Sequence, residues 1–144
     1  MDLQVDDFYR DVAAALLTLY GAFPRKLTLY VDDLIGHEEP DEFGLPSKRH
    51  QSCLGALLWL AEEGYLRFDS TIQFQALDQA VLTEKAFLRL TSTSPEATLA
   101  ADELPPSVQR LQSSLAFGLR QALHARDSER LAALARQLLA GGRP

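Results

Sequence analysis

Hydrophobic residues near the beginning of the chain recur with a helical period. Between residues 5 and 20 they fall on one face, at spacings of three and four, and comprise Val5, Phe8, Val12, Ala15, Leu16 and Leu19. This pattern predicts an amphipathic helix over about residues 5–20. The alternating segment 26–30 then predicts a short strand, and residues 31–35 predict a brief helix that ends at Gly36.

A broader apolar pattern occupies the middle of the chain. Ser47 follows Pro46 and belongs to a favoured capping type, so we predict a helix from Ser47 to about Glu63. Its apolar positions cover a wide face, as expected for the central helix of a domain, and comprise Cys53, Leu54, Leu57, Leu58, Leu60 and Ala61. The other face presents Trp59, which we interpret either as the anchor of an interface or as a packing residue under the hairpin or against the C-terminal helices.

Segments rich in β-forming residues follow this helix. Residues 65–68 predict a strand, and residues 69–71 have the composition of a turn. The return strand lies within residues 72–82, although the second half of that range also permits a helix capped at Asp78. Residues 83–90 predict another helix, which begins at a threonine suited to capping.

The remainder of the chain predicts a linker and two further helices. Residues 93–106 are rich in Ser, Thr, Pro and Ala and are typical of a linker. Helical stripes over 107–124 and 129–140 predict a C-terminal helical hairpin within residues 107–140. Two short helices bury such stripes poorly alone, so we expect them to pair across a homodimer, with packing on the preceding domain as the alternative. The candidate interface residues are Trp59, Leu111, Leu115, Leu119, Leu131, Leu134 and Leu138.

Length and composition restrict the class of protein. The chain of 144 residues, of which 47% are hydrophobic, fits one domain with an appendage and supports a packed core. Its longest apolar run, residues 53–61, is far too short to span a bilayer, and the first residues lack the basic and apolar regions of a signal peptide. Cys53 is the single cysteine, which excludes an internal disulfide. We therefore expect a cytoplasmic protein with no membrane partner.

Acidic and basic residues are unevenly distributed. The formal net charge is −6: residues 1–92 contain 15 acidic and 8 basic side chains, whereas residues 93–144 contain 5 acidic and 6 basic ones. Residues 36–46 predict a surface loop, here called the acidic loop, which contains Glu38, Glu39, Asp41 and Glu42. The C-terminal basic residues are all arginines, at Arg110, Arg120, Arg126, Arg130, Arg136 and Arg143. The acidic N-terminal part disfavours nonspecific nucleic-acid binding, because phosphates require cations.

Motifs that carry enzyme chemistry are absent from the sequence. It contains no glycine-rich phosphate loop, no G-x-S-x-G elbow and no C-x-x-C pair, and Cys53 has no accompanying His/Asp motif. His37 and the acids of the acidic loop match neither an HExxH helix nor an EF-hand, and such crowded carboxylates are usually solvated. We therefore predict a non-enzymatic protein with no catalytic residues, no metal site and no cofactor.

Two segments of the chain are similar to a family pattern. Residues 63–66, Glu-Gly-Tyr-Leu, and residues 80–85, Ala-Val-Leu-Thr-Glu-Lys, resemble the GYL…LTxKG pattern that many bacterial winged-helix regulators show around the wing. Ala86 stands where the pattern has its last glycine. The chain beyond residue 107 resembles that of small uncharacterised bacterial winged-helix proteins. The resemblance implies a mainly α protein with a small β-hairpin (α+β), in which a winged helix-turn-helix domain at residues 1–92 precedes the C-terminal helical hairpin.

This resemblance implies a transcription regulator that binds double-stranded DNA with a recognition helix at residues 47–63. Arg and Lys can bond guanine and Gln can bond adenine through base edges, while other cations contact phosphates. The implied DNA-binding residues are Arg25, Lys26, Ser47, Lys48, Arg49, Gln51, Ser52 and Arg67. The alternative is a protein–protein interaction module that keeps the winged fold without binding DNA. The acidic loop and the lack of cations in the wing tip predicted at 69–71 favour this alternative.

Overall fold

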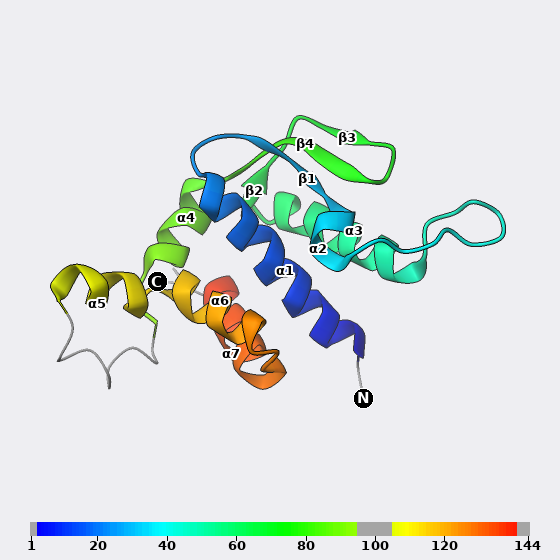
Figure 1. Ribbon diagram of the computed structural model, residues 1–144. Coiled ribbons are helices and arrows are strands. Elements are labelled where there is room, and N and C mark those ends of the chain that lie inside the picture. Colours follow the sequence, from blue (N-terminus) through cyan, green and yellow to red (C-terminus); the bar gives the residue numbers. More distant parts are fainter. Residues whose placement is uncertain (1–2, 95–104, 141–144) are drawn as a thin grey trace.

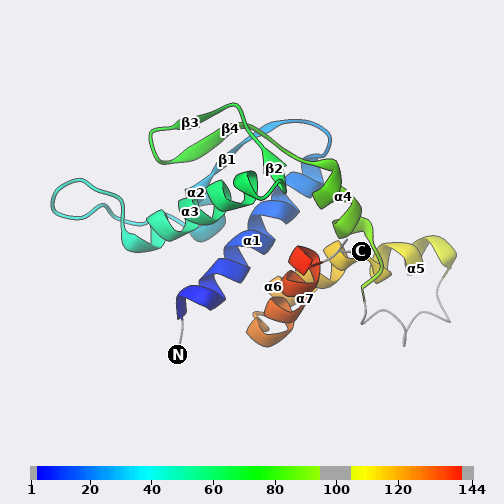
Figure 2. The ribbon, with the colours of Figure 1, turned by 180° about the vertical axis from the view of Figure 1, so that it is seen from behind.

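The helical stripe near the start of the chain forms α1 (Leu3–Ala22), and the other elements are arranged around it (Figures 1 and 2). The computed structural model describes residues 3–94 and 105–140, so most of the predicted linker and Arg143 lie outside the described residues. The helices that follow are α2 (Val31–Ile35), α3 (Lys48–Glu62), α4 (Glu84–Thr91), α5 (Pro106–Ser113), α6 (Leu115–His124) and α7 (Ser128–Ala140). The strands are β1 (Leu27–Tyr30), β2 (Leu66–Arg67), β3 (Ser70–Ile72) and β4 (Ala76–Leu82).

These elements make a mainly helical α+β structure with one small antiparallel sheet, as the sequence predicts. The brief helix predicted at 31–35 is confirmed with those bounds, and α3 begins directly after its predicted cap. α1 extends beyond its predicted end, and Pro24, which has no amide hydrogen to continue a helix, follows it. None of the helices in the described residues has both the length and the apolar character needed to cross a membrane.

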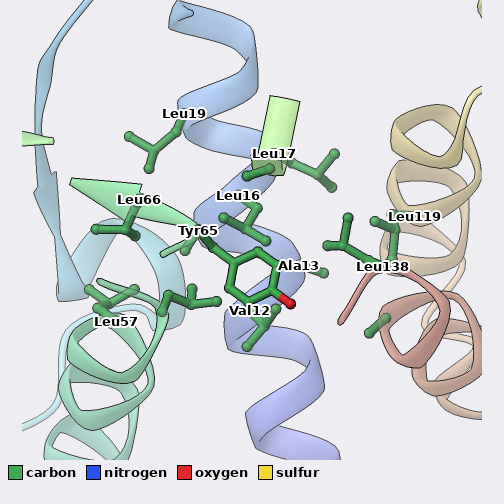
Figure 3. Close-up of a cluster of buried hydrophobic side chains, with 14 of the residues drawn as sticks. Val12, Ala13, Leu16, Leu17, Leu19, Leu57, Tyr65, Leu66, Leu119 and Leu138 are labelled. Carbon is green, nitrogen blue, oxygen red and sulfur yellow. The ribbon is translucent and has the colours of Figure 1, made fainter. Parts of the chain in front are cut away.

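α1 is buried on two sides and forms the centre of the core. Val12 and Leu16, from the predicted stripe, are fully buried, and so is Leu57 of α3. Ala13 and Leu17 lie outside the predicted stripe and are buried as well. Figure 3 shows these two residues on the side of α1 that faces α6 and α7, with α3 on the other side. The core therefore continues from α3 across α1 to the C-terminal helices.

The C-terminal leucines belong to the core of their own chain. Five of the six predicted interface leucines are buried in the same cluster as the α1 residues: Leu115, Leu119, Leu131, Leu134 and Leu138. Leu111, on α5, is exposed. The expectation that these helices pair across a homodimer is therefore corrected for the five buried leucines. Packing on the preceding domain occurs instead, because α1 offers α6 and α7 a second apolar face.

The helix predicted over 107–124 is interrupted at Ser114, which is extended (φ −71°, ψ 151°). The segment after α4 accounts for the break, because the Leu115 amide donates to the Ser92 carbonyl at 2.8 Å. A tertiary hydrogen bond thus replaces a helical one at this position. Ser114 then caps α6, since its Oγ accepts a hydrogen bond from the Phe117 amide at 3.1 Å.

The sheet has the strand order β1-β4-β2, and β3 also pairs with β4. The turn predicted at 69–71 is wrong: it lies at residues 73–74, here called the hairpin tip, where both φ angles are positive (44° and 63°). The Gln75 amide donates to the Ile72 carbonyl at 2.7 Å, which closes a two-residue turn of type I′. The tip moves because β3 pairs with β4 and takes up residues that were expected to turn.

The residues of the GYL…LTxK pattern join the end of α3 to α4. Thr83 caps α4, as predicted, and its Oγ1 also donates to the Gly64 carbonyl at 2.6 Å. Lys85 Nζ donates to the Glu63 carbonyl at 2.8 Å and lies 4.2 Å from the centre of the Tyr65 ring. Gly64 adopts φ 81°, a conformation that favours glycine. The pattern therefore has a structural role at this junction.

Candidate functional site at the start of α3

Ser47 begins α3 and is held by hydrogen bonds within the chain. Its Oγ accepts from the His50 amide at 3.0 Å, which is the capping bond that the sequence predicts. The same hydroxyl donates to Glu38 Oε1 at 3.1 Å and so ties the acidic loop to the helix. Gln51 is engaged nearby, because its side-chain amide donates to the Pro46 carbonyl at 2.8 Å. Two of the predicted DNA-contacting side chains therefore stabilise the turn into α3.

Arg49 is bound to a buried carboxylate. Its Nη1 and Nη2 donate to the two oxygens of Asp11 at 2.7 and 2.6 Å, and its Nε lies 3.7 Å from Asp7 Oδ2. Asp11 is 1% exposed, and the Arg49 side chain is 23% exposed. The hydrogen bonds to Asp11 raise the pKa of Arg49, and such a paired geometry is among the strongest that a guanidinium forms. Arg49 therefore joins α3 to α1, which leaves its donors poorly placed to reach a base.

His50 attaches the hairpin tip to α3. The residue is buried, and its Nε2 lies 2.7 Å from the Phe74 carbonyl oxygen. Its Nδ1 lies 3.8 Å from Asp32 Oδ1. The backbone of Phe74 is thereby held beside the start of α3, while Phe74 as a whole residue is 68% exposed. The hairpin thus presents an aromatic ring, and no cation, at its tip.

The other predicted DNA-binding residues do not form one surface. Lys48 and Ser52 are exposed near the start of α3, and no ion pair found among the described residues involves Lys48. Lys26 and Arg67 lie at the end of the sheet away from the hairpin tip, in a hollow of about 640 Å³ that two aspartates also line. Arg25 is exposed next to Lys26. The eight predicted residues are therefore divided between the start of α3 and the far end of the sheet.

The acidic loop exposes two large apolar side chains on an ordered backbone. Phe43 is 79% exposed and Leu45 is 56% exposed. Asp41 holds this segment, because its Oδ1 accepts hydrogen bonds from the amides of Phe43 and Leu45, each at 2.9 Å. Gly44 completes the turn with φ 77°, and its amide donates to the Asp41 carbonyl at 2.9 Å. The loop therefore presents both apolar residues to solvent in a defined conformation.

The acidic loop and the hairpin tip lie at the same end of the molecule (Figures 1 and 2). We call this end the docking surface, which consists of Phe43, Leu45 and Phe74 with the acids Glu38, Glu39, Asp41 and Glu42. Sequence reasoning identified the acids but missed the three apolar residues. Two of them had a local signal, since a Phe-Gly-Leu segment is unusual within a charged loop. Phe74 had no such signal in the sequence, because it lies in a segment of alternating apolar and polar residues that predicts a strand.

Trp59, the candidate interface anchor on α3, is covered on one side. Its ring packs edge-on against Phe8 of α1, with 5.2 Å between ring centroids. It also lies nearly parallel to the Tyr65 ring, at 6.4 Å. The side chain keeps 36% of its surface exposed. Trp59 therefore packs between α1 and the start of the sheet and leaves one edge at the surface.

Cys53 lies in the core, and the His37 ring lies beside a carboxylate five residues earlier in the chain. Cys53 is buried, as its apolar surroundings predict, and burial raises the pKa of its thiol to about 12. His37 Nδ1 lies 3.4 Å from Asp32 Oδ2, and this hydrogen bond is the main cause that raises the pKa of His37. Within residues 3–94 and 105–140, no group of three or more His, Cys, Asp or Glu side chains is placed to hold a metal ion.

Comparison with known proteins does not assign the chain to a family. No family model, no curated protein and no solved structure matches it. Its function is therefore inferred from its residues and their geometry.

Proposed function

We propose that residues 3–91 form a winged helix-turn-helix domain that binds another protein through the docking surface. The order of elements supports this fold, since α1, β1, α2 and α3 precede antiparallel strands and α4. The pairing of β1 with β4, next to the β3–β4 hairpin, supports it as well. In such a domain α3 occupies the place of the recognition helix and the hairpin is the wing. The groups around the start of α3 therefore decide what the domain binds.

The exposure of Phe43 and Phe74 carries the proposal that the partner is a protein. Fully burying a phenylalanine side chain contributes about 1.5–3 kcal/mol, so two exposed rings represent a large unused contribution to binding. Hydrogen bonds hold the backbone of both residues in place. A partner that covers the rings then orders little additional backbone. Aromatic residues are also enriched in the cores of protein interfaces.

The charge of the docking surface indicates the chemistry of its partner. Its four carboxylates would repel the phosphates of DNA, and Arg49 does not offset them because Asp11 already neutralises its charge. A protein surface with basic residues around an apolar hollow would attract the same carboxylates and accept the phenylalanines. We therefore infer a partner with a basic rim and an apolar pocket.

Site-specific photocrosslinking tests this proposal. A photoreactive phenylalanine analogue in place of Phe43, or of Phe74, is expected to form discrete protein adducts in cells. The matched control carries the same analogue in place of Leu88, which is exposed on α4 away from the docking surface. The proposal fails if adducts from the docking surface are no more abundant than those from the control position.

Binding of double-stranded DNA, as a transcription regulator would require, is the second candidate function. The observation in its favour is that Lys48 and Ser52 remain exposed near the start of α3. Fluorescence anisotropy with genomic DNA fragments at two salt concentrations separates the two candidates. DNA binding predicts salt-dependent association that Lys48→Ala weakens and Phe43→Ala leaves unchanged. The protein-interaction proposal predicts no salt-dependent association with DNA. It also predicts that the photocrosslinked protein adducts are lost when Phe43 is replaced by alanine.

A further inference from the structure

The turn between α6 and α7 contains a hollow of about 580 Å³ with mainly apolar walls. Phe117, Arg120, Gln121 and His124 line it from one stripe of α6, and Ala125 and Arg130 close it. Phe117 is partly exposed at this surface, whereas Arg120 is exposed. We call this hollow the α6–α7 pocket. It is the kind of apolar recess that accepts one large side chain from a partner.

Cationic groups border the α6–α7 pocket. Arg120 and Arg130 both line it, and Arg130 donates to Gln121 Oε1 at 3.2 Å, which places its guanidinium across the α6–α7 turn. Two acids, Asp127 and Glu129, lie close to Arg130 along the chain, and Asp127 begins α7, since its Oδ1 accepts from the Arg130 amide at 3.1 Å. The pocket therefore combines an apolar interior with a basic rim, which is the chemistry inferred for the partner of the docking surface.

We propose that the α6–α7 pocket binds the acidic loop of a second copy of this chain. Phe43 of one copy enters the pocket against Phe117 of the other, and the loop carboxylates face Arg120 and Arg130. This inference rests on the proposed docking function and names its partner. Charge complementarity supports it, because four acids accompany Phe43 and two arginines border the pocket. The ordered backbone of the acidic loop supports it further, since a rigid loop loses little entropy on binding.

The contact is intermolecular because of where the two surfaces lie. Figures 1 and 2 show the acidic loop projecting from one side of the molecule, well separated from the α6–α7 turn. Each copy therefore carries one loop to donate and one pocket to accept, and the contact is of the head-to-tail kind. A single loop in a single pocket buries a small area, so we expect weak association that depends on concentration and weakens with added salt.

Sedimentation velocity of the full chain over a wide range of concentration tests the proposal. We expect the mean mass to rise with concentration, and Phe43→Ala or Arg120→Glu to weaken association about tenfold or more. Both side chains are exposed, so neither change should disturb the fold, and circular dichroism verifies this. The matched controls are Leu88→Ala and Arg110→Glu, which change an exposed leucine and an exposed arginine elsewhere and should associate like the unchanged chain.

Mixing the two variants provides the sharpest test. Phe43→Ala retains its pocket and Arg120→Glu retains its loop, so an equimolar mixture should form a one-to-one complex that neither variant forms alone. A chain that stays monomeric at all concentrations overturns the proposal of self-association, while the crosslinks expected from the docking surface can still occur with another protein. If the Phe43→Ala variant self-associates as strongly as the unchanged chain, the proposed role of the acidic loop is wrong. If the Arg120→Glu variant does so, the proposed role of the α6–α7 pocket is wrong.

Discussion

At the scale of single residues, the ion pair with Asp11 gives Arg49 a structural role. The carboxylate lies inside the protein and accepts two hydrogen bonds from the guanidinium, which itself reaches solvent only in part. Removing the guanidinium leaves the buried Asp11 carboxylate without its partner. The free energy of unfolding lost in this way is larger than the net stabilisation that the ion pair provides. The pair therefore holds α3 against α1, and Arg49 is more important for stability than for recognition.

Replacing Arg49 should accordingly destabilise the fold. We expect Arg49→Ala to lower the free energy of unfolding by about 3 kcal/mol, the low end for a broken buried pair, because the Arg49 side chain is 23% exposed. Lys48→Ala, a change at an exposed neighbour, should remain within about 0.5 kcal/mol of the unchanged protein. Urea denaturation at neutral pH measures both. Similar stabilities for the two variants would contradict a structural role for the pair.

At the scale of elements, the junction between α3 and α4 depends on Thr83. This residue caps α4 through the Ala86 amide and reaches back to the carbonyl of Gly64, just after the end of α3. Lys85 adds a bond to the Glu63 carbonyl, which would otherwise lack a partner inside α3. A pattern that resembles a family signature is thus explained by hydrogen bonds between two helix ends.

Removing the Thr83 hydroxyl should weaken this junction. We expect Thr83→Ala to reduce stability by about 1–2 kcal/mol, as for other lost helix caps. Thr91→Ala is the matched control, because the Thr91 hydroxyl bonds only to carbonyls of the preceding turn in the same helix. That change should cost little, since alanine favours helix more than threonine does. Thermal unfolding monitored by circular dichroism compares them, and equal shifts in Tm would argue against the junction.

At the scale of the whole molecule, α1 carries the core on two sides. α3 packs on one side, and α6 and α7 pack on the other (Figure 3). The N-terminal domain and the C-terminal helices therefore share one cluster of buried residues. Such a shared core predicts that the described parts of the chain unfold together.

A change within the C-terminal helices tests this shared core. Leu138→Ala should lower the stability of the whole chain by about 3 kcal/mol, in one cooperative transition followed by both near- and far-UV circular dichroism. Leu111→Ala, on the exposed side of α5, should have almost no effect. If Leu138 instead joined two chains, its replacement would change the mass in solution and leave the stability of the monomer intact.

The structural features that could be predicted depend on residues that are close together in the sequence. Ser47 and Thr83 are recognisable as caps because the hydrogen bonds that they form span only three residues. The interruption at Ser114 was not predictable, since it depends on a backbone bond from the distant Ser92. The partner of Arg49 was hidden for the same reason, because Asp11 lies 38 positions earlier and in another helix.

The sequence by itself determined the order and type of most elements, because hydrophobic periodicity and helix caps act over a few residues, but it did not predict β3 or the division of α5 from α6. It also determined the acidic N-terminal part and the arginine-rich end. Only the tertiary structure decided which charges remain free, where the hairpin turns, and that the C-terminal leucines face α1. These features depend on packing between segments far apart in the chain, and the same packing leaves Phe43 and Phe74 exposed at one end.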